Sequence, residues 1–216
     1  MKRVIVVNAH PDDMEIGMGG TIAALAAAGT EVISVVLTDG GGAPNPFSWS
    51  REKMAAVRIE EAEAAADVLG VARVVFFGLQ DLRSASNYRD AGERLTELLA
   101  EVAPAEVYTL HESIDRHPTH QLAGRLTSES VVTSGVTAAP NLWAYETWSP
   151  FSSWDRLEYI DEYIGMKLMA ISAHKSQLAS VPYGEGVVGL NRWRALFADP
   201  HQSGNLGAFA EAFVKL

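Results

Sequence analysis

Short runs rich in β-branched residues alternate with longer helical stretches, and this alternation restricts the fold of the chain more than any other feature. The strand-like runs are 4–7, 31–38, 74–78, 106–110 and 141–146. Between and after them lie the stretches that we interpret as helices, 17–28, 51–69, 89–102, 119–133 and 156–176. Strand–helix alternation of this kind predicts an α/β fold, a Rossmann-like parallel sheet with helices on both faces.

The length of the chain favours a single domain. Its 216 residues are enough for one core of ordinary size, and no internal repeat or low-complexity linker divides them. We therefore treat residues 1–216 as one domain whose core spans roughly 3–178. The tail, 179–216, is rich in Gly and Pro, and we assign no helix or strand to it.

The composition excludes several kinds of chemistry and partner. The chain has no Cys, which removes disulfides, thiolate zinc sites and cysteine nucleophiles together. Lys and Arg number 17 against 27 Asp and Glu, and the formal charge of −10 argues against nucleic acid or an anionic membrane as partner. No apolar run is long enough for a signal peptide or a membrane span. We expect a cytoplasmic protein that forms a homo-oligomer and acts on a small molecule.

Polar residues follow four of the predicted strands, where the carboxyl ends of parallel strands would bring them to one edge of the sheet. In chain order these residues are His10, Asp12, Asp13, Glu15, Asp39, Asp81, His111, Asp115, His117 and His120. Without thiols, imidazoles and carboxylates together would suit zinc or another first-row divalent ion. Two His and one carboxylate, with a position left for water, form the arrangement of hydrolytic zinc sites.

Taken singly, each of these residues has a simpler explanation. His10 could be a surface residue of a turn, and Asp12 and Asp13 could cap the helix that follows. The segment 117–120 could be a polar loop with Pro118 at the first helical position. Two His/Asp clusters about a hundred residues apart, both at predicted strand ends, are less easily explained in this way. The coincidence predicts a metal site.

The motifs resemble those of a known family. The resemblance begins with Ala9-His10-Pro11-Asp12-Asp13 and extends over roughly residues 3–178 in the same order and spacing, through 15–22, 37–40, 58–61, 69–71, 115–120 and 174–177. This series is similar to the LmbE-like or PIG-L family of zinc-dependent de-N-acetylases. The motif sequences are most similar to those of the bacillithiol-pathway members, whose substrate is an N-acetylglucosamine that carries malate.

The resemblance implies a reaction and the residues that perform it. The reaction is hydrolysis of the N-acetyl amide of an N-acetylglucosamine conjugate, which releases acetate and a free amine. His10, Asp13 and His120 would bind zinc or another divalent metal, and Asp12 would be the general base. His117 would stabilise the oxyanion or donate a proton.

Three further positions are expected to bind substrate, and one position departs from the family pattern. The substrate-binding residues are Arg58, Asp39 and His174. Where the family usually has Asp between the two His of the second motif, this chain has Thr119. A hydroxyl contributes no charge, so we expect His117 to be less basic here unless Asp115 takes over that function.

Two other functions compete with this interpretation. A dinucleotide-binding module would explain glycines after the first strand, but they stand at 17, 19 and 20 without G-x-G-x-x-G spacing. The carboxylates of Asp12, Asp13 and Glu15 would also repel a pyrophosphate there. A non-catalytic protein that binds sugar or metal on the same fold is the second alternative, and only turnover separates it from the enzyme.

The aromatic residues indicate less about the function than the polar motifs do. Phe47 and Trp49 lie in the long loop 39–50 and could stack on a sugar or pack on the protein. We assign Trp143, Tyr145 and Trp148 to the core or to an interface.

Overall fold

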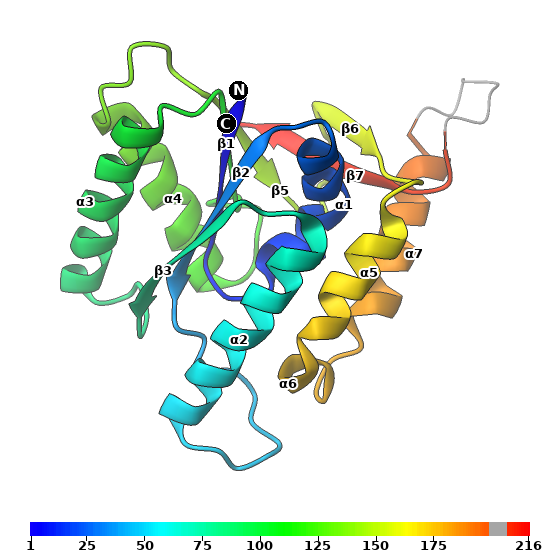
Figure 1. Cartoon of the computed structure of the whole chain (residues 1–216), viewed down its shortest axis with the longest axis horizontal. Helices are drawn as coiled ribbons and strands as arrows, with labels where there is room; N and C mark the ends of the chain where they lie inside the picture. Colours follow the sequence, from blue (N-terminus) through cyan, green and yellow to red (C-terminus); the bar gives the residue numbers. More distant parts are fainter. Residues whose placement is uncertain (199–206) are drawn as a thin grey trace.

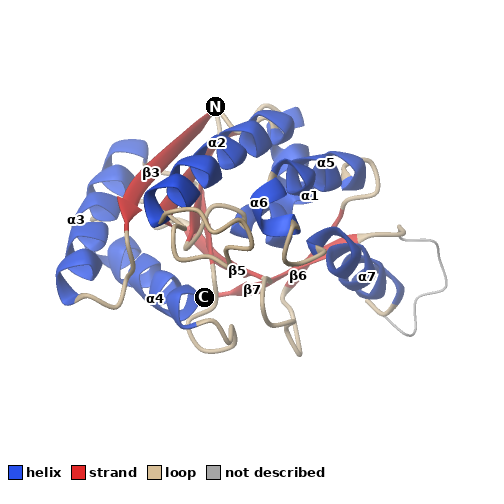
Figure 2. Ribbon diagram, turned by 90° about the horizontal axis from the view of Figure 1, so that it is seen from below, coloured by secondary structure: helices blue, strands red, loops and turns tan. Residues whose placement is uncertain are grey.

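The computed structural model describes residues 1–198 and 207–216, and within them one sheet lies between two groups of helices (Figures 1 and 2). The sheet has seven strands in the order β3-β2-β1-β4-β5-β7-β6. The strands are β1 Arg3–Asn8, β2 Glu31–Thr38, β3 Arg73–Leu79, β4 Glu106–Thr109, β5 Asn141–Tyr145, β6 Arg156–Tyr159 and β7 Ala210–Lys215.

The helices form two layers, one on each face of the sheet. They are α1 Asp13–Ala27, α2 Arg51–Leu69, α3 Ala85–Val102, α4 Pro118–Thr133, α5 Ile164–Ala173, α6 Lys175–Leu178 and α7 Tyr183–Leu196. Helices α3 and α4 pack together on one face, and α1, α2 and α5 pack together on the other (Figure 1). The predicted α/β fold with helices on both faces is therefore confirmed.

The central strands of the sheet are parallel, and they are buried on both faces, as is usual for parallel sheets. β1 pairs in parallel with β2 and β4, β3 pairs with β2, and β5 pairs with β4. Residues 4–7 of β1 are all inaccessible to solvent, as expected for a continuous β-branched run under helices on both sides. Loops that follow these parallel strands all emerge at one edge of the sheet.

Two predictions about the second half of the chain are wrong. The stretch 156–176 is not one helix, because β6 occupies 156–159 and α5 begins only at Ile164. The sheet is also not wholly parallel, since β7 pairs antiparallel with both β5 and β6. The partner of β6 is a strand from the unassigned tail, about fifty residues away, so local periodicity carried no signal for this pairing. Within the described residues the tail also contributes α7.

Candidate metal centre and active site

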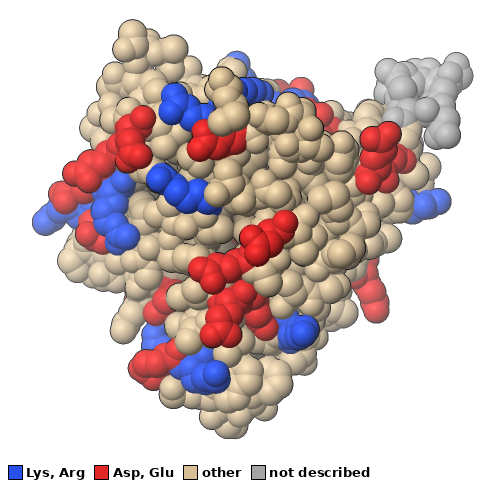
Figure 3. Space-filling view, viewed as in Figure 1, with Lys and Arg blue, Asp and Glu red and all other residues tan. Residues whose placement is uncertain are grey.

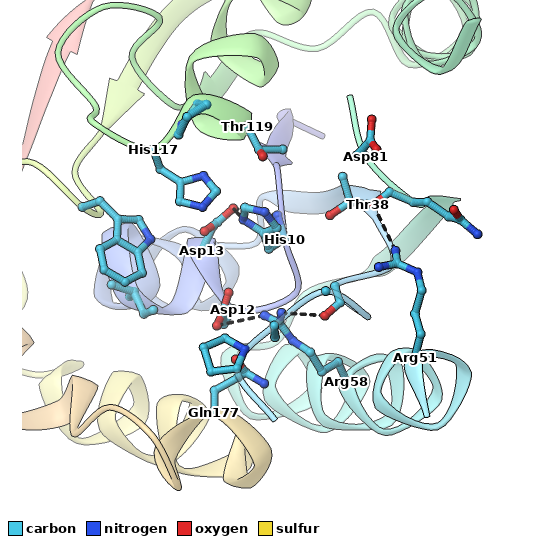
Figure 4. A pocket seen from close by; sticks show the side chains of 18 of the residues that line it. His10, Asp12, Asp13, Thr38, Arg51, Arg58, Asp81, His117, Thr119 and Gln177 are labelled. Carbon is cyan, nitrogen blue, oxygen red and sulfur yellow. Dashed lines mark hydrogen bonds and ion pairs between the residues drawn. The ribbon is translucent and has the colours of Figure 1, made fainter. Parts of the chain in front are cut away.

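A cavity of about 480 Å³ opens at the carboxyl ends of the parallel strands, where an open α/β sheet binds its ligands (Figure 4). Its walls come from the loops that follow β1, β2 and β3 and from the start of α4. Five predicted site residues are among those that line it, namely His10, Asp12, Asp13, Arg58 and His117. Thr119 and Asp81 line it as well.

Imidazoles and one carboxylate converge at the floor of the cavity. Ring nitrogens of His10, His117 and His120 lie within 4.8 Å of one another. Nδ1 of His10 is 3.1 Å from Nε2 of His120. The carboxylate of Asp13 reaches both rings, with Oδ1 3.2 Å from Nε2 of His120 and Oδ2 3.6 Å from Nδ1 of His10. The three side chains expected as metal ligands thus approach a common point, and His117 lies beside them.

Two chain segments 110 residues apart build this cluster. His10 and Asp13 lie in the turn between β1 and α1, where the backbone N–H of His10 donates to Oδ2 of Asp13 at 2.8 Å. His120 lies in the first turn of α4, which begins at Pro118, one residue before the predicted start. Because β1 and β4 are neighbours in the sheet, the two turns meet at its edge.

Asp115 orients the His120 ring from behind. Its Oδ2 lies 3.1 Å from Nδ1 of His120 and accepts a hydrogen bond from Oγ1 of Thr147 at 2.7 Å. Its Oδ1 accepts the backbone N–H of His117 at 2.8 Å. A carboxylate on the second nitrogen of an imidazole is the usual support of a metal-binding His. Asp115 therefore aligns the His120 ring, whereas it bonds His117 through the backbone N–H.

The charges at the cluster favour a cation. Burial alone would lower the pKa of His120, but the Asp13 charge and the bond to Asp115 outweigh burial and raise that pKa to about 10. Burial likewise opposes ionisation of Asp13, yet His120 and His10 hold the pKa of Asp13 well below its ordinary value. The Asp13 carboxylate therefore requires a positive partner at this point, either a proton on His120 or a metal ion. The donor set of two imidazoles and a carboxylate fits a zinc-like ion.

Asp12 lies beside this cluster with its carboxylate held by Arg58. Oδ2 of Asp12 is 3.0 Å from Nη2 of Arg58, and both side chains are almost fully buried. Burial raises the pKa of Asp12, and the Arg58 charge offsets part of that rise. Arg58 also donates to the carbonyl oxygens of Pro11 at 2.6 Å and Gly40 at 3.2 Å. Arg58 thus ties the base candidate and two loops together.

His117 is placed to contact a bound molecule. It lines the cavity, and its buried Nδ1 has no hydrogen-bond partner among the described residues. Burial and the positive charges of His120 and His10 lower the pKa of His117 to about 4. The ring is therefore neutral at pH 7 and can donate one N–H or accept one hydrogen bond.

Two predicted substrate-binding residues do not line the cavity. Asp39 accepts a hydrogen bond from Arg51 at 2.6 Å and from the backbone N–H of Gly41 at 2.9 Å. His174 is 1% exposed, with Nε2 3.5 Å from Oε1 of the buried Glu15. Neither residue is among those that line the cavity, and their role in substrate binding stays a prediction.

Several cavity residues were missed by sequence reasoning. Trp148, which we assigned to the core or an interface, lines the cavity and is 39% exposed, with its ring 6.1 Å from that of His117. Gln177 and Tyr183 reach the cavity from α6 and α7. Tyr183 belongs to the unassigned tail, where no local pattern marks it. Phe47 and Trp49 stack on each other at 4.4 Å and are not among the lining residues.

Comparisons with known proteins agree with the motifs and the geometry. The model of the PIG-L family, described as GlcNAc-PI de-N-acetylase, matches residues 5–131. A Bacillus anthracis protein named as a probable N-acetyl-alpha-D-glucosaminyl L-malate deacetylase 2 is 26% identical over 212 residues, which cover 89% of this chain and 91% of the relative.

Solved structures share the whole fold. An N,N'-diacetylchitobiose deacetylase from Pyrococcus horikoshii superposes with a TM-score of 0.85 and 26% identity, over all of this chain and 84% of its own. GalB, a 4-carboxy-2-hydroxymuconate hydratase from Pseudomonas putida, has a TM-score of 0.86 at 24% identity, over all of this chain and 96% of its own. Because a hydratase shares it, the fold alone does not select a reaction. The matched family model covers more than half of the chain, including the first and second His/Asp motifs, and the chain belongs to the PIG-L family of GlcNAc-PI de-N-acetylases.

Proposed function

We propose that this protein is a metal-dependent deacetylase that hydrolyses the N-acetyl amide of an N-acetylglucosamine conjugate. The observation that carries the proposal is the convergence of His10, Asp13 and His120 on one point, with Asp12 and His117 beside it in a cavity. Two of the relatives named above are deacetylases by name, one of N-acetyl-alpha-D-glucosaminyl L-malate and one of N,N'-diacetylchitobiose, and they support the same reaction.

His10, Asp13 and His120 would hold the metal, which we propose to be zinc. Two imidazoles and one carboxylate form a ligand set of catalytic zinc sites, and the Asp115 support of His120 fits it. When bound, such an ion would lower the pKa of water towards 7 and polarise the amide carbonyl. The proton transfer and the stabilisation of the developing negative charge would be carried out by side chains of the protein.

Asp12 is placed to move the proton. Its carboxylate would accept a proton from the attacking water and return it to the departing nitrogen. In the balanced reaction the C–N bond breaks, the water oxygen joins the acyl carbon, and the amine keeps the proton. Arg58 keeps the Asp12 carboxylate in place, because its guanidinium is itself anchored to Pro11 and Gly40.

His117 would donate its N–H to the oxygen that becomes negative during the attack. Its Nδ1 has no partner among the described side chains and backbone groups, and the ring lines the cavity. One donor of this kind typically contributes about 3–4 kcal/mol to transition-state stabilisation. A neutral imidazole can make this bond without carrying a charge.

The location and partners of the protein stay predictions. In the part of the chain that the structure describes, every helix is too short or too polar to span a bilayer. On the face drawn in Figure 3, acidic and basic side chains are interspersed. We continue to expect a cytoplasmic homo-oligomer that acts on a small molecule and not on nucleic acid or membranes.

Metal analysis of purified variants tests the ligand set. Asp13→Ala removes a ligand, and we expect its zinc affinity to fall by more than the about 10–100-fold that loss of an outer partner costs. Asp115→Asn should show that smaller loss. His117→Ala should keep its metal. If His117→Ala loses zinc as severely as Asp13→Ala, His117 is also a ligand and the proposed set of three is wrong.

Acetate release tests the reaction. The zinc-loaded protein should release acetate from N-acetylglucosamine conjugates, and Asp12→Asn should lower kcat by about 10²–10⁴-fold while zinc stays bound. Binding of metal and sugar without any acetate release would instead identify a non-catalytic binding protein.

A further inference from the structure

A second cavity, of about 490 Å³, adjoins the first one. Cavities of this size are typical of small-molecule sites. Most of its wall is apolar and comes from α7 and the segments before it, with Pro150, Val181, Pro182, Val187 and Leu190 among the lining residues. Ile16 and Tyr183 line both cavities, so the two spaces lie next to each other at these side chains.

The far end of the first cavity has the opposite character. Its lining residues include Arg51, Arg83, Asp81 and Gln80. Figure 4 shows Arg51, Asp81 and Thr38 together on one side of His10, and His117 on the other side. Alternating donors and acceptors of this kind suit the hydroxyl groups of a sugar.

A substrate amide has two halves that leave the reacting carbon in different directions. The nitrogen carries the sugar, and the carbonyl carbon carries the acyl group. If the sugar lies among the polar groups near Arg51 and Asp81 and the acyl group extends to the other side of the histidine cluster, the acyl group would approach Ile16 and Tyr183, which line both cavities. That direction leads into the apolar cavity.

We propose that the second cavity binds the N-acyl group, and that the enzyme prefers apolar acyl chains longer than acetyl. The inference rests on the proposed function, because it assigns a substrate class to the same site. The bonds made and broken are those of any amide hydrolysis, with a fatty acid released in place of acetate.

The polar residues of the second cavity are compatible with such a ligand. The Glu146 carboxylate accepts hydrogen bonds from the buried guanidinium of Arg194, including one from Nε at 3.2 Å, so its charge is neutralised. Asn191 is 4% exposed and donates Nδ2 to the carbonyl of Ala210 at 2.8 Å. Its Oδ1 has no partner within the described residues and offers one acceptor to a hydroxyl on the chain.

Kinetics on a series of N-acyl glucosamines, from acetyl to octanoyl, test the proposal. Each buried CH₂ is worth about 0.8 kcal/mol, or about fourfold in a binding constant. We expect kcat/KM to rise at least about tenfold between acetyl and hexanoyl. A flat or falling series overturns the proposal.

Variants on α7 show where the chain binds. Leu190→Trp fills the second cavity, and we expect it to lower the hexanoyl-to-acetyl ratio of kcat/KM at least about fivefold. Val188→Trp, on the same helix but outside the lining residues, should leave that ratio unchanged. Because a ratio of two activities is measured, partial loss of folded protein cancels. An equal ratio in wild-type protein and Leu190→Trp contradicts the assignment.

Lengthening the other half of the substrate provides the remaining control. Octyl and methyl glycosides of N-acetylglucosamine should differ little. If the octyl glycoside is preferred and Leu190→Trp removes that preference, the cavity binds the aglycone and the proposal is wrong. Failure of the proposed function would look different, because no member of either series would then be hydrolysed.

Discussion

Asp12 has a backbone conformation that ordinary residues avoid, with φ 139° and ψ −16°. It precedes α1 as the N-cap, but its side chain makes no capping hydrogen bond and turns instead to Arg58. Strained residues of this kind persist only where their surroundings hold them, and they concentrate at functional sites. The strain at Asp12 therefore agrees with a catalytic role for its carboxylate.

The strain can be measured by comparing two substitutions that both remove the carboxylate. Asp12→Gly and Asp12→Ala lose the same ion pair with Arg58, but only Gly adopts φ 139° without strain. We expect Asp12→Gly to have an unfolding free energy about 1–3 kcal/mol higher than Asp12→Ala in urea titrations. Equal stabilities would show that the backbone at this position is relaxed. Both variants should lack deacetylase activity.

Among the helices and strands, β7 contacts α1, the helix that begins at the candidate site. Glu211 of β7 is fully buried and accepts the backbone N–H groups of Gly20 and Thr21 in α1, at 3.0 and 2.7 Å. Lys167 of α5 pairs with the same carboxylate at 2.5 Å. Helix α1 departs from helical geometry at Met18, two residues before these contacts. One carboxylate thus joins a strand and two helices behind the active site.

Lys167→Met tests this junction. The substitution leaves the Glu211 charge buried without its cation, and breaking such a pair typically costs about 3–5 kcal/mol. The double variant Lys167→Met/Glu211→Gln removes both charges, so we expect it to lose clearly less stability than the two single losses added together. Urea unfolding of the four proteins gives the coupling. Additive losses would mean that Lys167 and Glu211 contribute independently.

For the whole molecule, the proposed metal site joins segments that are distant in the sequence. His10 and Asp13 precede and begin α1, and His120 lies in α4 on the opposite face of the sheet. The unfolded chain does not hold these side chains together, so metal should bind the folded state almost exclusively. Metal binding and folding are then thermodynamically linked.

Zinc should therefore stabilise the protein against urea. At a free zinc concentration a thousandfold above Kd, the unfolding free energy should rise by about 4 kcal/mol, and a chelator should reverse the rise. Asp13→Ala is the matched control and should respond to neither addition. A wild-type midpoint that is insensitive to zinc would contradict a site that forms only on folding.

The sequence alone determined the parallel half of the fold and most of the site. Continuous β-branched runs such as 4–7 are stable only under two layers of helices, and polar residues after parallel strands must share one edge. This rule predicts that His10, Asp13, His117 and His120 lie together, as they do in the structure. Local sequence is sufficient to predict this grouping, because each of these residues lies in the loop or helix start that follows a predicted strand.

Only the tertiary structure decided the rest, because it depends on contacts between distant segments. The β6–β7 pairing, the cavity contacts of Trp148 and Tyr183, and the burial of His174 against Glu15 have no local pattern. The pairing of the edge strand β6 depends on a strand from the distant tail. Whether a side chain faces a cavity depends on how the segment that carries it packs against the rest of the protein. The grouping of the candidate residues could therefore be predicted from the chain, whereas the shape of the cavity around them could not.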